Sequence, residues 1–137
     1  MKKVIGLFMM LSVAWLVGCT ENETIEKLTR VDVFKVTVAG NYADEIIIAD
    51  LNKIDRLNQA FDRIEWERNV KAEMSRREDI KAVHFLEDDE NMPERLEDYY
   101  VWFESNGTST IIESDSYGRL DEAGTKILKD VFEFEDK

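Results

Sequence analysis

The pattern of hydrophobic and polar positions divides the chain into three segments. Residues 4–17 form an apolar stretch without a charged side chain, and residues 20–30 are mostly polar. From Val31 onwards, apolar residues recur with the periods of strands and helices, and no repeat or Pro- or Gly-rich linker interrupts them. We therefore expect an N-terminal apolar segment at 1–18, a polar tether at 19–30 and a single domain at 31–137.

Alternating or short apolar runs predict the strands of this domain. A run rich in β-branched residues predicts a strand over 31–38, with a bulge near Phe34 where the alternation slips. Further runs predict strands at 45–49, 66–74 and 80–86.

Apolar stripes at helical spacing predict two helices. Each begins after an aspartate suited to cap its first turn, Asp50 for the first helix and Asp121 for the second. Each stripe keeps one apolar face turned inward. The stripes consist of Leu51, Ile54, Leu57, Phe61 and Ile64 in the first helix, and of Leu120, Ala123, Ile127, Leu128 and Val131 in the second.

The clearest local signal is Asn106-Gly107, which joins apolar runs at 98–105 and 108–113. Asn-Gly between two such runs is typical of a type I′ hairpin with a two-residue loop. That loop would place Phe103 opposite Thr110. The resulting order of elements is β-α-β-β-β-α, which predicts an α+β fold. We expect an antiparallel sheet of about four to five strands with two helices packed on one face.

Composition limits the classes of function. The chain has 137 residues, with 30 Asp and Glu against 18 Lys and Arg, and a formal net charge of −12. This charge disfavours binding to nucleic acid. A single Cys and a single His exclude an internal disulfide and the usual zinc ligand sets. We expect no metal and no cofactor.

The N-terminus has the layout of a secretory signal, because Lys2 and Lys3 precede a short apolar stretch. Fourteen residues of helix cover roughly 21 Å, less than the hydrocarbon core of a bilayer. Leu16-Val17-Gly18-Cys19 resembles the lipobox of bacterial lipoproteins. The resemblance implies removal of residues 1–18, a diacylglyceryl anchor on the Cys19 thiol, and a location on the extracytoplasmic face of the cell membrane.

The domain itself loosely resembles small uncharacterised lipoproteins of Gram-positive bacteria. The likeness rests on the aromatic run at 99–103 and on the closing stretch at 117–120. No activity follows from this resemblance.

Three sets of residues are candidates for chemistry. His84, with Ser75 or Ser105 as a partner, is a candidate base, although a polar position on a half-buried strand is the simpler interpretation. Carboxylates are abundant in this chain, and Glu65 beside Trp66 and Glu104 after Trp102 and Phe103 are each a candidate for a catalytic acid, with a solvated strand edge as the alternative. The acidic run at 87–90 lacks the ligand spacing of a calcium loop and fits a solvated loop better.

Aromatic side chains supply the candidate binding patch, which consists of Tyr100, Trp102 and Phe103. Tyr and Trp are enriched in binding hot spots, and an acidic domain suits a cationic protein or peptide. We therefore expect a non-enzymatic binding or accessory module for another envelope protein or a cationic ligand. The alternatives are a small carboxylate-dependent hydrolase of envelope substrates and an immunity-type protein that sequesters a cationic peptide.

Overall fold

The computed structural model describes residues 26–136. The lipobox motif, Cys19 and the apolar N-terminal segment lie outside these residues. Within the described part of the chain, no helix is both long and apolar enough to cross a membrane.

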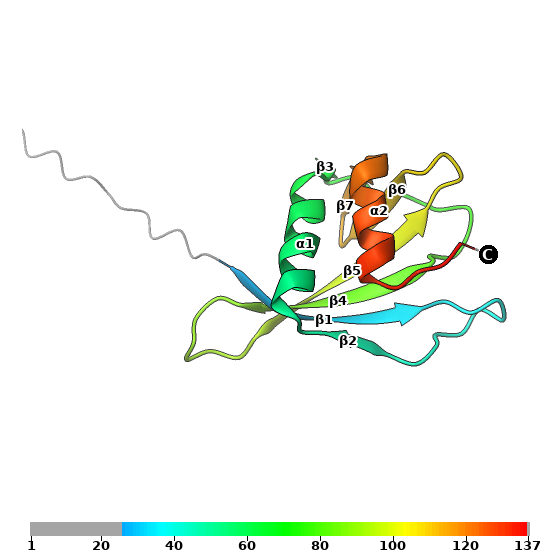
Figure 1. The fold of residues 1–137 in the computed structure, drawn as a ribbon. Coiled ribbons are helices and arrows are strands. Elements are labelled where there is room, and N and C mark those ends of the chain that lie inside the picture. Colours follow the sequence, from blue (N-terminus) through cyan, green and yellow to red (C-terminus); the bar gives the residue numbers. More distant parts are fainter. Residues whose placement is uncertain (1–25, 137) are drawn as a thin grey trace, which may run out of the picture.

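One antiparallel sheet of seven strands forms the body of the domain (Figure 1). The strands follow one another across the sheet in the order β2-β1-β4-β5-β6-β7-β3. Their bounds are β1 Lys27–Lys35, β2 Ile46–Ile48, β3 Glu65–Arg68, β4 Ile80–Glu87, β5 Arg95–Phe103, β6 Ser109–Glu113 and β7 Ser116–Leu120.

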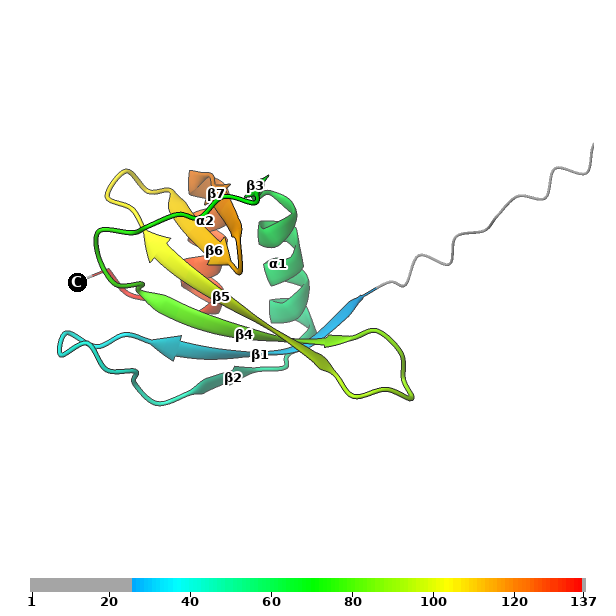
Figure 2. The same cartoon turned by 180° about the vertical axis from the view of Figure 1, so that it is seen from behind.

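Both helices pack on the same face of the sheet (Figures 1 and 2). Helix α1 spans Leu51–Asp62 and helix α2 spans Glu122–Val131. The predicted caps are confirmed, because the carboxylate of Asp50 accepts a hydrogen bond from the Lys53 N–H at 3.0 Å and that of Asp121 accepts one from the Gly124 N–H at 2.8 Å. The predicted α+β class with two helices is therefore confirmed.

The sheet has more strands than the four to five that we expected. Strand β7 was not predicted, because its sequence Ser-Tyr-Gly-Arg-Leu lacks a clear apolar alternation. A two-residue turn joins it to β6, with Ser114 at a positive φ of 50°. At the other end of the domain, β1 begins at Lys27, within the segment expected to be a tether.

The irregularity in β1 also differs from the prediction. The register shifts between Leu28 and Arg30, not near Phe34. In addition, the strand expected at 66–74 extends only over Glu65–Arg68.

The predicted register of the β5–β6 hairpin is wrong by one residue. Phe103 lies opposite Ser109, and Trp102 lies opposite Thr110. The loop is longer because Asn106 does not adopt the positive φ that a type I′ turn needs; only Gly107 does, at 87°. Instead, the Asn106 side chain accepts a hydrogen bond from the Thr108 N–H at 3.1 Å.

The core lies between the helices and the sheet and is mostly apolar, although His84 and the hydrogen-bonded pair of Ser109 and Thr125 are also buried there. Helix α1 buries the predicted Ile54 and Leu57, whereas Leu51 is 79% exposed. The buried face of α2 is rotated from the predicted stripe: Ala123 is exposed, and Gly124 and Thr125 are buried instead.

The opposite face of the sheet, called the outer face below, carries no helix. Figure 2 shows that the segment between β3 and β4 crosses this face on its way back to the centre of the sheet. The crossing segment, residues 69–79, contacts β5, because the Trp102 indole donates a hydrogen bond to the Arg76 carbonyl at 2.9 Å.

Candidate functional site

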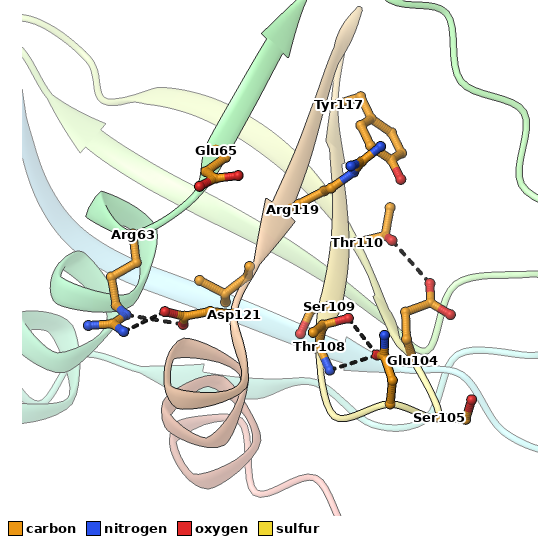
Figure 3. A pocket seen from close by; sticks show the side chains of 12 residues that line it. Arg63, Glu65, Glu104, Ser105, Thr108, Ser109, Thr110, Tyr117, Arg119 and Asp121 are labelled. Carbon is orange, nitrogen blue, oxygen red and sulfur yellow. Dashed lines mark hydrogen bonds and ion pairs between the residues drawn. The ribbon is translucent and has the colours of Figure 1, made fainter.

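A polar hollow lies at the end of the sheet, where the β5–β6 hairpin, β7 and the end of α1 meet (Figure 3). It is an open hollow of about 660 Å³. Most of its lining is polar, with side chains of both charges. The lining residues used below are Arg63, Glu65, Glu104, Asn106, Thr108, Thr110, Tyr117, Arg119 and Asp121.

An ion pair between the two helices forms one wall. Arg63 follows the last residue of α1, and Asp121 caps the first turn of α2. The Arg63 guanidinium donates two hydrogen bonds to the Asp121 carboxylate, from Nε at 3.1 Å and from Nη2 at 2.5 Å. The guanidinium holds the pKa of Asp121 below its usual value. The positive charge of Arg63 and the negative charge of Asp121 therefore compensate each other in this wall.

The β5–β6 hairpin forms the opposite wall. Thr110 donates a hydrogen bond from its hydroxyl to the Glu104 carboxylate at 3.0 Å. The Asn106 side-chain oxygen accepts one from the Thr108 hydroxyl at 2.6 Å. These contacts orient an acid and an amide at the rim, as Figure 3 shows for Glu104 and Thr110.

Strands β7 and β3 contribute the floor. Arg119 of β7 is the register partner of Glu65 of β3, so that both lie on the outer face. The Arg119 side chain nevertheless lies along Tyr117 in Figure 3, with its guanidinium 5.6 Å from the centre of that ring. Among residues 26–136, no carboxylate lies within 4.0 Å of the Arg119 guanidinium. The Arg119 guanidinium thus forms no direct ion pair, although Tyr117 and the carboxylates of Glu67 and Glu65 raise its pKa. It lines the hollow together with Glu65 and Glu104.

His84 lies outside the hollow, beneath α1. Its imidazole lies between the tilted rings of Phe61 and Tyr99, with ring centroids at 4.7 and 4.4 Å. It is only 4% exposed, and its Nε2 has no hydrogen-bond partner in the described structure. Burial lowers the pKa of His84 to about 3.

The structure does not bring His84 together with either serine that we considered. Ser105 lies in the β5–β6 loop, whereas His84 pairs with Glu97 near the other end of β5. The six steps along the strand from Glu97 to Phe103 span roughly 20 Å. Ser75 is exposed in the crossing segment. Neither of these two serines therefore forms a Ser–His pair with His84.

Glu65 and Glu104 were singled out separately, and the structure places both in the hollow. The expected apolar setting beside Trp66 is missing, because Trp66 points to the helix side and Glu65 to the outer face. Two carboxylates of the acidic run at 87–90 form local hydrogen bonds. Asp88 accepts one from Arg95 at 3.3 Å, and Asp89 accepts one from the Asn91 N–H at 2.9 Å.

The predicted aromatic patch is not a single exposed surface. Neighbouring strand residues point to opposite faces, and both faces are covered at this end of β5. The crossing segment leaves Trp102 only 6% exposed, and Phe103 is 8% exposed with its ring 4.5 Å from that of Phe134. Tyr100 alone is half-buried, with the Lys81 ammonium 5.8 Å from its ring centre.

Sequence reasoning missed Arg63, Arg119 and the threonines of the hollow. Arg63 and Asp121 are 58 residues apart in the chain, and no local motif connects them. The one available signal was that each flanks a predicted helix: Arg63 falls at the end of the first, and Asp121 was identified as the cap of the second.

No protein-family model matches the chain, and no curated protein matches it. Among solved structures, the chain is similar to the crystal structure of a thioesterase-like protein from Clostridium sporogenes. The two share 23% sequence identity with a TM-score of 0.52, over 77% of this chain and 94% of the other. At this identity the similarity shows a shared thioesterase-like fold.

Proposed function

We propose that the protein is a lipid-anchored binding module on the extracytoplasmic face of a bacterial membrane, and that the hollow holds a charged segment of another envelope protein or peptide. The observation that carries this proposal is that the Arg119 guanidinium, which forms no direct ion pair, lines one hollow together with the carboxylates of Glu65 and Glu104. The anchor rests on the sequence of Leu16 to Cys19.

The side chains of the hollow suit a ligand that carries both charges. A guanidinium binds carboxylates through paired hydrogen bonds, while Glu65 and Glu104 accept from ammonium or guanidinium groups. The hydroxyls and the Asn106 amide add neutral donors and acceptors. A volume of about 660 Å³ leaves room for a few residues of a peptide. The formal net charge of −12 favours encounter with cationic partners.

The burial and the lowered pKa of His84 argue against acid–base catalysis by this histidine and so favour a binding function. A general base needs a pKa near the working pH and a hydrogen bond to the proton that it takes. Burial lowers the pKa of His84 to about 3, and its Nε2 has no partner within residues 26–136. It is a neutral core residue at pH 7.

The experiment that tests the proposal is site-specific photo-crosslinking in cells that express the full chain. A photoreactive side chain at Thr108, in the hollow, is expected to form a discrete adduct, because a bound segment would lie against it. The same group at Asp55, exposed on α1, is the matched control and is expected to form none. Arg119→Gln in the Thr108 background is expected to reduce the adduct about tenfold, since it removes a charged hydrogen-bond donor.

Two results would contradict the proposal. Adducts of equal yield from both positions would mean random contact. An adduct from Thr108 that persists unchanged in Arg119→Gln would mean that the guanidinium takes no part in binding.

A second candidate, a carboxylate-dependent hydrolase, is favoured by the placement of Glu65 and Glu104 in one hollow. The similar structure is described as thioesterase-like, so acyl thioesters are the first substrates to test, followed by chromogenic glycosides. The binding proposal predicts no turnover above the blank. Turnover that falls about a hundredfold or more in Glu104→Gln would favour the hydrolase.

A further inference from the structure

Strand β2 is one edge of the sheet, and its outer side has no neighbour. It pairs with β1 through Ile46, Ile47 and Ile48, and the order of strands ends there. In Figures 1 and 2 no other described element lies beyond β2. In an antiparallel pair, alternate residues of an edge strand direct their N–H and C=O groups away from the sheet. This edge is therefore a template for a further strand.

The two edges of the sheet differ in how they are protected. Strand β3, at the other edge, carries Glu65, Glu67 and Arg68, and charges within an edge strand discourage pairing. Strand β2 consists of isoleucines alone, and Ile47 is 56% exposed on the outer face. The unprotected edge is thus the apolar one.

Acidic residues bracket the isoleucines of β2. Asp44 and Glu45 precede them and Asp50 follows, and none of these three forms an ion pair with another residue in the range 26–136. The nearby carboxylate of Asp32 in β1 raises the pKa of Glu45, while the Arg30 guanidinium, which is paired with Asp32, acts in the opposite direction. Negative charge along this edge is therefore only partly compensated, because the nearby guanidinium of Arg30 is itself paired with Asp32.

From this arrangement we infer that the free edge of β2 takes up an extended segment of a partner protein, which has alternating apolar residues and basic residues at its ends. Backbone hydrogen bonds would add the segment to the sheet as a further strand. On the outer face, an apolar residue would pack on Ile47, and a basic residue two positions away would lie beside Glu45. This surface is separate from the hollow, so the inference goes beyond the proposed function and does not depend on Arg119.

A second copy of the chain fits this edge poorly. If two β2 strands paired antiparallel about Ile47, Asp44 of each copy would lie opposite Asp50 of the other. Like charges placed directly opposite each other destabilise a strand pair. Each copy also carries a formal net charge of −12. Charge complementarity therefore selects a basic partner.

Hydrogen exchange on the full chain in detergent tests the inference. The probe is a short capped peptide with lysine at both ends and alternating valine and threonine between them. We expect it to slow exchange at the backbone of residues 44–50. A control peptide of the same charge, with proline in place of the central valine, is expected to give no protection, because proline lacks the N–H that a strand ladder needs.

Two matched variants separate strand addition from general attraction between opposite charges. Ile47→Lys and Leu96→Lys add the same charge on the outer face, and both parent side chains are 56% exposed. We expect Ile47→Lys to weaken peptide binding about tenfold and Leu96→Lys to leave it within about twofold. Asp44→Asn alters a charge outside the strand, and we expect about threefold weaker binding from it.

Several outcomes would overturn the inference. These are equal effects of Ile47→Lys and Leu96→Lys, protection of residues 44–50 by the proline peptide, and protection confined to other parts of the chain. Concentration-dependent protection of residues 44–50 without any peptide would identify a second copy as the occupant. If Ile47→Lys unfolds the chain, the affinity of Asp44→Asn for the peptide becomes the test in its place. An affinity equal to that of wild type would then contradict the inference.

Discussion

Replacing His84 with leucine is expected to make the stability of the domain less sensitive to acid. The pKa of His84 is about 3 in the folded protein against an ordinary value of 6.5, because burial disfavours the charged imidazole. Below pH 6.5 the unfolded chain therefore binds a proton that the folded chain does not. The resulting loss of stability is absent at pH 7 and grows as the pH falls toward 3, reaching about 2 to 3 kcal/mol by pH 4.5.

Urea unfolding of wild type and variant at pH 7 and pH 4.5 measures this effect. The His84→Leu variant is expected to lose about 2 to 3 kcal/mol less than wild type between the two pH values. His84→Gln is the matched control, because it removes the titrating group but keeps a polar side chain between Phe61 and Tyr99. Both variants should lose the same pH dependence. Parallel changes in all three proteins would show that the folded chain protonates His84 readily.

Truncating Phe132 to alanine is expected to destabilise the domain by about 3 to 5 kcal/mol, because it leaves a cavity at a fully buried position. Phe132 immediately follows α2 and is 0% exposed, among the largest of the fully buried side chains. The midpoint of urea unfolding measures the loss. Leu51→Ala, at a position that is 79% exposed, is the control and should change stability by less than about 0.5 kcal/mol. A loss below about 1 kcal/mol in Phe132→Ala would mean that α2 does not close the core.

The helices were predictable from sequence because their signals are local. Asp50 and Asp121 lie directly before apolar stripes, and a capping carboxylate acts within three residues of its own position. The strands near the N-terminus and centre of the domain were predictable for the same reason, since alternation is visible within a few residues.

The features that sequence did not reveal depend on contacts between distant segments. The exposure of the aromatic run depended on what covers each face of β5, and the covering groups are the crossing segment at 69–79 and Phe134, which follows α2. The hairpin register depended on the backbone conformation of Asn106. This residue has no positive φ, and its side-chain oxygen accepts a hydrogen bond from the Thr108 N–H. Neither fact is encoded in the spacing of apolar residues.

The hollow was visible from sequence only in part. Glu65 and Glu104 stood out because each lies near tryptophan, but their convergence requires the pairing of β5 with β6, of β6 with β7 and of β7 with β3. Arg119 gave no signal, since an arginine in a short polar strand is common. The similarity to a thioesterase-like protein adds a fold, and one fold supports many functions. The side chains of the hollow therefore carry the functional proposal.

The intact mass of the protein extracted from membranes of its native host tests the central claim, which is that this binding domain is held at the membrane from outside the cytoplasm. We predict a chain that begins at Cys19 and carries the added mass of a diacylglyceryl group. The Cys19→Ser variant should lack that mass and leave the membrane fraction. A chain that retains Met1, or a Cys19 with a free thiol, would contradict the claim.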